Sequence, residues 1–384
     1  MLGTEGDSPR GRIYLMEAIN RGVGTLDEGA RAHLDGCLGC MGCESACPSG
    51  VNFSGRIEAF TTRLAPGPLG ALWRRIGAWT SQNRTVIDQT TRLARLADSL
   101  GLGPLRRRLP AFGLLPETPA KDHGAQDPGA TERRTAAGAR LRTTSSRLAE
   151  TNGRSAGFEG ARPLRVALLK GCAAHGLRPE IDQAATEVLA RNGFELVSVP
   201  EQGCCGALAL HGGRREEALG LARANVAAFA ESGAERVVAT AAGCGAQLKD
   251  YGRILADDTR LGQAASRVAA MARDICELLI DEGLHSPARR LDTGGDVAYH
   301  DPCHLLHVQG VAQAPRSVIQ AATGRQPVDL GDNRICCGSA GSYNLEHPCV
   351  ALELGRTKAL HAAGRDLALL ATGNIGCMLQ LERA

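Results

Sequence analysis

The feature that most constrains this chain is a spaced set of cysteines that occurs twice. Each copy has a leading cysteine, an adjacent pair followed by glycine, and a last cysteine beside a glycine. The pair begins 32 residues after the leading cysteine in the first copy and 33 in the second. The last cysteine follows the pair by 39 and 40 residues. The copies are Cys172, Cys204, Cys205 and Cys244, then Cys303, Cys336, Cys337 and Cys377. Such matching spacing indicates an internal repeat.

The eight thiols are candidate ligands for a soft metal, because thiolates bind iron–sulfur clusters and zinc. In both copies, apolar segments typical of buried strands run toward the cysteines, and helical segments lie between them. Alternating strands and helices predict a parallel α/β sheet with right-handed crossovers. The expected strands are 164–169, 194–199, 236–240, 296–299, 327–330 and 367–371. The expected helices are 179–192, 214–231, 316–322 and 349–363, with a further helical region at 255–283. Ligands of such sheets gather beyond the carboxyl ends of the strands, so each set is expected to converge in one pocket.

A second motif lies near the N-terminus, after two short helical segments expected at 12–19 and 26–34. It reads C-x2-C-x2-C-x3-C-P and consists of Cys37, Cys40, Cys43, Cys47 and Pro48. This is the bacterial ferredoxin spacing for a [4Fe–4S] cluster. The alternative is a zinc site, which usually pairs two C-x2-C units across a longer gap. In two-cluster ferredoxins the fourth cysteine binds the other cluster, whose remaining thiols come from another motif.

The sequence contains no earlier motif of this kind, and two explanations stay open for Cys47. The favoured hypothesis is that the natural product carries a further C-x2-C-x2-C-x3-C-P motif upstream of residue 1. The alternative is that Cys47 folds back and completes a single cluster with Cys37, Cys40 and Cys43.

Composition narrows the function classes. The net charge is +3 and aromatic residues make up 3% of the chain, which does not suggest a nucleic-acid binder. No apolar run reaches the length of a membrane span, and the first residues lack the pattern of a secretion signal. Fourteen cysteines without such a signal favour a reducing compartment and metal or redox work over a disulfide scaffold.

These patterns predict that the chain divides into four segments. Residues 1–110 are expected to form a helical, ferredoxin-like [4Fe–4S] domain, with amphipathic helices over 53–108. Residues 111–162, rich in Pro, Gly, Ser, Thr and Arg, are expected to be a flexible linker. Residues 163–290 and 291–384 are expected to hold the two cysteine repeats.

Two cysteines have no counterpart in the other copy. Cys276 and Cys349 are therefore interpreted as structural thiols. Three histidines, His300, His304 and His307, lie around Cys303. Either they tune a cluster through hydrogen bonds or carry protons to a quinone, or they only cap a loop.

Both patterns together resemble the iron–sulfur subunit of bacterial glycolate oxidase over nearly the whole chain. The segments that carry the resemblance are 7–13, 37–51, 203–206, 300–304 and 373–377. The repeated part is also similar to the CCG domains of heterodisulfide reductase. Related arrangements occur in the lactate-utilisation and anaerobic glycerol-3-phosphate dehydrogenase iron–sulfur subunits.

The resemblance implies an N-terminal helical ferredoxin-like part followed by two CCG α/β domains. It implies an electron-transfer subunit that is not catalytic alone and that binds [4Fe–4S] clusters through the twelve cysteines of the three motifs. Its partners would be FAD-binding glycolate dehydrogenase subunits and a membrane quinone. The chain would be cytoplasmic, or peripheral on the inner face of the cytoplasmic membrane.

One departure bears on the cluster type. The full CCG pattern ends in C-x2-C and supplies five thiols for a non-cubane cluster. Here the first position of that pair is Ala241 in one copy and Asn374 in the other, so each copy offers four. Alternatives remain a thiol–disulfide redox subunit like heterodisulfide reductase, a lactate-utilisation iron–sulfur subunit, and a metal-binding scaffold. No Gly-rich phosphate loop lies between a strand and a helix, so this chain is not expected to bind a flavin itself.

Overall fold

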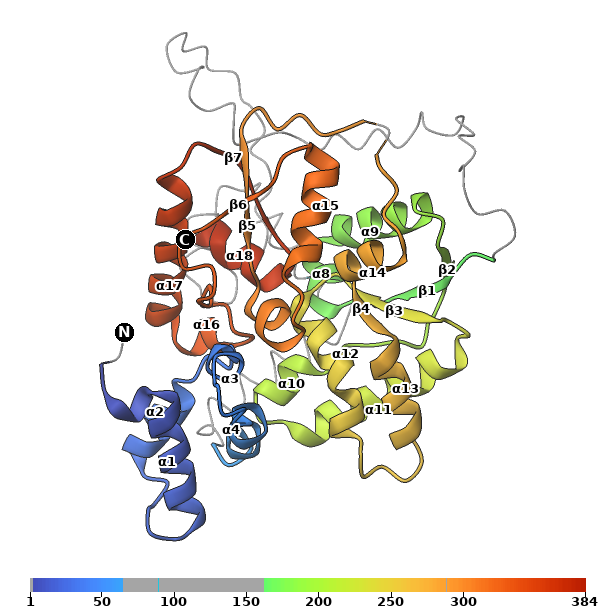
Figure 1. Ribbon diagram of the computed structural model, residues 1–384. Helices are drawn as coiled ribbons and strands as arrows, with labels where there is room; N and C mark the ends of the chain where they lie inside the picture. Colours follow the sequence, from blue (N-terminus) through green and yellow to red (C-terminus); the bar gives the residue numbers. More distant parts are fainter. Residues whose placement is uncertain (1–2, 65–88, 90–161, 288) are drawn as a thin grey trace.

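The computed structural model describes residues 3–64, 89, 162–287 and 289–384, and Figure 1 shows their arrangement. Most of the amphipathic region expected at 53–108 and nearly all of the linker expected at 111–162 lie outside the described residues. Of that amphipathic region, the structure describes one helix, α4 (Phe53–Thr61). Among the described residues, no helix combines the length and hydrophobicity needed to cross a bilayer.

The N-terminal segment is helical, as expected. A 3₁₀ turn, η1 (Glu5–Asp7), precedes α1 (Pro9–Asn20), α2 (Glu28–Asp35), the short α3 (Gly42–Ser45) and α4. Side-chain oxygens begin three of these helices by accepting from backbone amides: Ser8 for α1, Asp27 for α2 and Asn52 for α4. The helices pack around Met16, Leu34, Phe53, Ile57, Phe60 and Leu64.

The first cysteine repeat forms a four-stranded parallel sheet of order β2-β1-β3-β4. Its strands are β1 (Arg165–Leu168), β2 (Glu195–Val197), β3 (Arg236–Ala239) and β4 (Ala272–Asp274). Its helices are α8 (Cys172–Leu177), α9 (Pro179–Arg191), α10 (Ala207–His211), α11 (Arg215–Glu231), α12 (Ala242–Ile254), α13 (Gly262–Met271) and α14 (Ile275–Glu282).

Helices cover both faces of this sheet. Alternate residues of a strand point to opposite faces. Thus Val166 and Val238 pack against α9 and α14, whereas Ala167 and Val237 pack against α11, α12 and α13. Burial on both faces explains the continuous apolar strands seen in the sequence.

The fourth strand corrects one expectation. The sequence suggested a helical region over 255–283, but β4 interrupts it and pairs with β3 from Val237 to Ala239. Ala272 and Asp274 are buried there, and Asp274 then starts α14 through a capping box with Glu277. A three-residue strand without alternation is fixed by tertiary pairing and leaves no periodic signal.

The second repeat forms a three-stranded parallel sheet of order β6-β5-β7. Its strands are β5 (Asp296–His300), β6 (Val328–Asp329) and β7 (Leu367–Thr372). Its helices are the π-helical turn η2 (His304–Val308), α15 (Gln313–Thr323), α16 (Tyr343–Glu346), α17 (Pro348–Ala363) and α18 (Ile375–Arg383).

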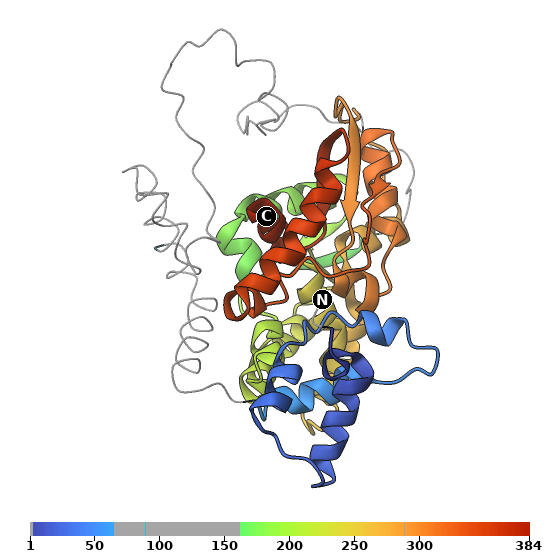
Figure 2. The ribbon, with the colours of Figure 1, turned by 90° about the vertical axis from the view of Figure 1, so that its left-hand side faces the viewer.

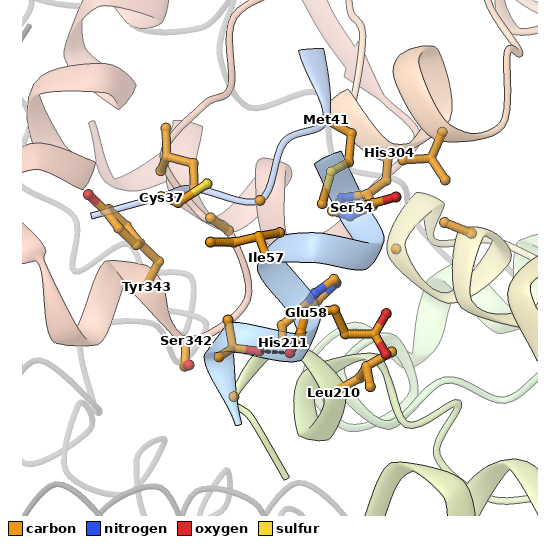
Figure 3. A pocket seen from close by; sticks show the side chains of 18 of the residues that line it. Cys37, Met41, Ser54, Ile57, Glu58, Leu210, His211, His304, Ser342 and Tyr343 are labelled. Carbon is orange, nitrogen blue, oxygen red and sulfur yellow. Dashed lines mark hydrogen bonds between the residues drawn. The ribbon is translucent and has the colours of Figure 1, made fainter. Parts of the chain in front are cut away.

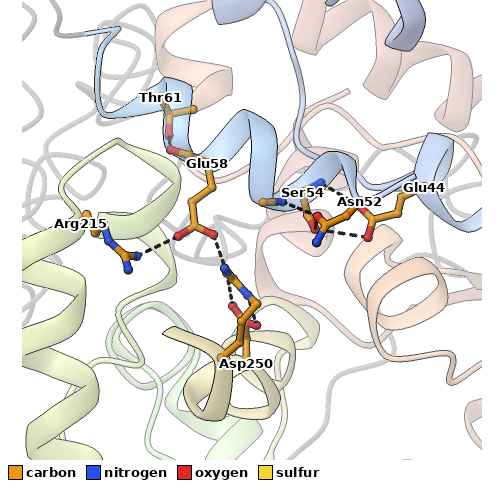
Figure 4. A network of polar contacts seen from close by, with 9 residues as sticks. Glu44, Asn52, Ser54, Glu58, Thr61, Arg215 and Asp250 are labelled. Atoms are coloured by element: carbon orange, nitrogen blue, oxygen red, sulfur yellow. Dashed lines mark hydrogen bonds and ion pairs between the residues drawn. The ribbon is translucent and has the colours of Figure 1, made fainter. Parts of the chain in front are cut away.

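The N-terminal helices lie at one end of the molecule, against both repeats, as Figures 1 and 2 show. Glu58 of α4 joins them to the first repeat, since its carboxylate accepts from Arg215 at 3.1 Å and from Arg253 at 2.5 Å (Figure 4). Arg253 also donates to Asp250 at 2.7 Å. The Glu58 side chain is 15% exposed, so this pairing is partly shielded from water.

Candidate metal centres

The first three cysteines of the N-terminal motif lie on one tight loop beside the N-terminal core. The loop turns through left-handed backbone at Gly39 and Met41, with φ of 59° and 57°. Cys37, Met41 and Cys43 pack against the N-terminal core. Burial, followed by the nearby Cys40 and Cys37, raises the pKa of Cys43 to about 11.

Cys47 has different surroundings. The backbone amides of Val51 and Ser49 act on its sulfur and lower its pKa. Burial raises the pKa of Cys37 and Cys40 instead. Backbone amides also favour the thiolates of Cys37 and Cys40, but there burial outweighs them, so the fourth cysteine of the motif is the one whose pKa is lowered.

The four cysteines of the first repeat converge as expected. Cys204 Sγ lies 3.5 Å from Cys172 Sγ, and Cys205 Sγ lies 3.3 Å from Cys244 Sγ. Hydrogen bonds from Cys172 and then Cys205 lower the pKa of Cys204, whereas the pKa values of Cys172 and Cys205 are raised, so Cys204 becomes a thiolate before these two. Cys172 and Cys244 begin or lie in helices that follow β1 and β3, which explains how distant residues meet.

A buried polar pair holds the loop that carries Cys204 and Cys205. Asn225 accepts from the Gly203 amide at 2.8 Å and donates to the Cys204 carbonyl at 2.9 Å. Tyr251 donates to the Cys205 carbonyl at 2.9 Å. Sequence reasoning missed both residues. The sequence feature that could have indicated the role of Asn225 is its place among the buried residues of α11, beside Ala222 and Val226.

The four cysteines of the second repeat also come together. A hydrogen bond with Cys336, and then burial, raise the pKa of Cys303 well above its usual value. Cys337 and Cys377 lie with His300 in a buried group whose ligand atoms are all within 4.8 Å of one another. Asn374, which stands where the fifth thiol of the CCG pattern would be, donates to Cys377 Sγ at 3.4 Å.

Lys358 and Gly338 lie beside the cysteines of the second set. The Lys358 ammonium donates to the Asp332 carbonyl, and its side chain is 1% exposed. Burial lowers the pKa of Lys358, whereas Cys337 and Asp332 act to raise it. Sequence reasoning missed this residue, although it follows Ala351 and Gly355 on the buried stripe of α17. Gly338 adopts φ of 92°, and a Cβ there would meet Ala351 O at 2.5 Å.

The three motifs lie next to one another. Ser45 of the N-terminal motif contacts His307, four residues after Cys303, at 2.7 Å, so the N-terminal motif lies beside the second set. Burial, and to a smaller extent Cys303, raises the pKa of Cys40. The Ala242 amide donates to Gly373 O at 3.0 Å, and the Gly243 amide donates to Asn374 Oδ1 at 3.5 Å. These bonds join the loops that lead to Cys244 and Cys377.

A cavity of about 330 Å³ opens between the three parts (Figure 3). Cys37 and Ile57 line it from the N-terminal segment, His211 from the first repeat, and His304 and Tyr343 from the second. The His211 and His304 rings lie 5.3 Å apart, and burial lowers the pKa of both.

The histidines around Cys303 point in three directions. His300 faces Cys337 and Cys377. His304 Nδ1 lies 3.7 Å from Cys303 Sγ, and its ring faces His211. His307 leaves the pocket and contacts Ser45 of the N-terminal motif. Only His300 and His304 therefore stand close to thiols of the second set among the described residues.

Cys276 and Cys349 lie outside the two sets. Burial strongly raises the pKa of Cys276 at the start of α14. Cys349 is exposed in the first turn of α17, the helix start that the sequence predicted.

The donor chemistry fits a thiolate-bound metal centre. Two thiolates on one tetrahedral metal with bonds of roughly 2.3 Å lie roughly 3.8 Å apart. The sulfur separations of 3.5 and 3.3 Å in the first set are close to that value. As thiolates, sulfurs this close would repel one another, and a shared cation would offset that repulsion.

Comparisons with known proteins agree with this chemistry. The CCG cysteine-rich domain family matches residues 166–249 and 297–382. The chain is 32% identical to the glycolate oxidase iron–sulfur subunit of Escherichia coli over 100% of its length and 86% of the relative's. It is 29% identical to a probable glycolate oxidase iron–sulfur subunit of Bacillus subtilis over 98% of its length and 83% of the relative's.

A more distant relative covers less of the chain. Lactate utilization protein A of Oceanobacillus iheyensis is 28% identical over 57% of the chain and 88% of that protein. These relatives support a redox role and suggest an iron–sulfur cluster. The chain belongs to the family of glycolate oxidase iron–sulfur subunits, with two CCG domains.

Proposed function

We propose that this chain relays electrons, through [4Fe–4S] clusters, from an FAD-binding subunit that oxidises a 2-hydroxy acid. The clusters would be held by Cys37, Cys40, Cys43 and Cys47, by the four cysteines of the first repeat, and by the four of the second. The 2-hydroxy acid would be glycolate and the final acceptor a membrane quinone. The chain would work in the cytoplasm or on the inner face of the cytoplasmic membrane, and would not turn over glycolate alone.

One observation carries the proposal: the three cysteine motifs adjoin. Ser45 of the N-terminal motif lies 2.7 Å from His307, four residues after Cys303, and backbone bonds join the loops of Cys244 and Cys377. Electron transfer slows steeply with distance, so adjacent centres suit a relay. We further propose the division expected from the sequence: an N-terminal cluster domain over 1–110, a linker over 111–162, and CCG domains over 163–290 and 291–384.

The test is reduction of the metal centres by substrate. The chain is purified without oxygen together with its flavin subunits, iron is quantified, and spin-resonance spectra are recorded before and after glycolate is added. We expect glycolate to reduce the centres only when the flavin subunits are present. Cys303→Ser should interrupt reduction of the second-repeat centre. Cys276→Ser and Cys349→Ser, which change cysteines outside the sets, are the matched controls.

Two results would overturn the proposal. Turnover of glycolate by the isolated chain would reveal an active site of its own. A fully metal-loaded protein that holds zinc and no iron would exclude the relay. Reduction by lactate and not by glycolate would keep the relay but reassign the substrate to the lactate-utilisation type.

A thiol–disulfide activity is the second candidate, and the lowered pKa of Cys204 favours it because a thiolate is the nucleophile in disulfide exchange. The reduced protein would then cleave a disulfide substrate, and Cys204→Ser would abolish that cleavage. A relay predicts no such reaction.

A further inference from the structure

We propose that His300 is an additional ligand of the metal centre in the second repeat, where it binds iron through an imidazole nitrogen. The inference rests on the proposed iron–sulfur function and extends it to a mixed cysteine–histidine site. It concerns one side chain at the carboxyl end of β5, three residues before Cys303.

The His300 side chain is buried and has no hydrogen-bond partner for its ring nitrogens among the described residues. His300 is 0% exposed, and neither Nδ1 nor Nε2 has a hydrogen-bond partner among the described residues. The Asn333 side chain lies near the ring and acts on its pKa, but both of its ends have other partners. Its Oδ1 accepts from the Asp301 amide at 3.3 Å, and its Nδ2 donates to Tyr299 O at 3.0 Å and to Asp301 Oδ2 at 2.5 Å. Leaving a buried polar group without a partner destabilises the fold, so an imidazole kept in such a place calls for a ligand role.

The ring of His300 also faces two thiols of the second set. One ring nitrogen of His300 and the sulfurs of Cys337 and Cys377 all lie within 4.8 Å of one another, and all three residues are buried. Neutral imidazole is a common metal ligand beside thiolates. The flanking residue is fixed, because Arg316 donates to both oxygens of Asp301 at 2.8 and 2.6 Å. That clamp holds the residue directly after His300 in place.

The two repeats differ at the position of His300. Three residues before Cys172, at the matching strand end, the first repeat has Leu169, which is 1% exposed. The first pocket therefore has an apolar wall where the second has an imidazole. The second repeat also has Asn374 in place of a fifth thiol, so a nitrogen ligand would add to a set of four sulfurs.

A histidine ligand would distinguish the two centres. Imidazole is neutral, so it would add a nitrogen donor to the four thiolates of the second set without changing their negative charge. The first set, with Leu169 at the matching place, would have sulfur donors alone.

The test uses the full-length, anaerobically prepared protein with its iron bound. Electron–nuclear double resonance is recorded on the reduced centres, with natural histidine and with histidine labelled by nitrogen-15. We expect a nitrogen coupling of a directly bound imidazole that changes with the label. His300→Leu, which reproduces the residue of the first repeat, should lose that coupling.

Two further variants keep the result decisive if His300→Leu loses its second centre. His300→Cys offers a thiolate at the same place and should retain iron without the nitrogen coupling. His304→Leu changes the neighbouring ring and should keep the coupling. A coupling absent from the parent protein, unchanged in His300→Leu, or lost in His304→Leu instead would overturn the inference.

The iron content separates this inference from the proposed function. Iron bound by the second repeat without a histidine coupling would refute the ligand and leave the relay standing. A second repeat without iron would refute both.

Discussion

Ser45 Oγ lies 2.7 Å from His307 Nδ1, although 262 residues separate them in the chain. Ser45 ends α3, directly after the first three cysteines of the N-terminal motif, and His307 follows Cys303 in the second repeat. The other ring nitrogen of His307 contacts Arg334 O at 3.0 Å. One imidazole thus bridges the N-terminal motif and the loop before Cys336.

We expect this bridge to contribute a coupling energy of about 0.5–1.5 kcal/mol, the usual net value of a hydrogen bond. A double-mutant cycle of Ser45→Ala, His307→Ala and the double variant, measured by urea unfolding, tests it. Amide exchange in residues 37–47 should also speed up in His307→Ala. Ser342→Ala, which removes an exposed hydroxyl bonded to Glu346, is the control. Fully additive effects would show that the contact carries no energy.

Gly338 is expected to be indispensable to the second pocket. Alanine there would hold φ of 92° and place its Cβ 2.5 Å from Ala351 O, so the Cys336–Cys337 loop must shift. The backbone strain alone costs of the order of 1–3 kcal/mol. Gly338→Ala should lose the iron of one centre and unfold at lower urea concentration.

Gly203 offers a matched control for that variant. It precedes the equivalent cysteine pair, and a Cβ there would meet no atom within 4 Å. Gly203→Ala should keep its iron. Equal iron loss in both variants would mean that the pocket rejects any added methyl group, and that the conformation of Gly338 is not the cause.

Lys358 should raise the potential of the second centre, because a buried cation stabilises the more negative, reduced state. Lys358→Met is expected to lower that midpoint potential in a redox titration followed by spin resonance. Lys358→Gln keeps a donor for Asp332 O and separates the loss of charge from the loss of the hydrogen bond. Lys170→Met removes an exposed lysine near Cys172 and should change nothing. An unchanged potential in Lys358→Met would refute the electrostatic role.

Asp274 should make stability depend on pH. Burial, and then Glu277, raise its pKa from about 3.8 to about 6, while Lys249 acts in the opposite direction. The folded state therefore binds this proton more tightly than the unfolded state. The stability it contributes is complete below pH 4 and is lost as the pH rises through 6.

Asp274→Asn removes this titration and keeps an oxygen that can cap α14. Between pH 4 and 7 the unfolding free energy of the parent should fall relative to the variant by up to about 3 kcal/mol. Asp281→Asn, an exposed carboxylate of the same helix, is the control. Parallel pH profiles of parent and Asp274→Asn would contradict the prediction.

Local patterns in the chain were enough to predict the repeat, the parallel α/β class and the cysteine sets. They suffice because buried strands are continuous apolar runs and each cysteine follows a strand end. The expected helices at 179–192 and 214–231 correspond to α9 and α11 within a residue or so. The spacing of Cys37, Cys40 and Cys43 likewise predicted a local group.

The way in which the N-terminal helices and the two repeats pack together depends on contacts between segments that are distant in the chain. Local sequence patterns do not predict such contacts. Pairing with β3 alone made a strand of Ala272–Asp274, and a three-residue strand has no periodicity to detect. The sequence placed three histidines near Cys303, but their directions depend on packing from α10, α3 and the second pocket. The sequence also does not predict that His300 is buried without a partner or that Lys358 is a buried cation. Burial of both depends on residues that are far away in the chain.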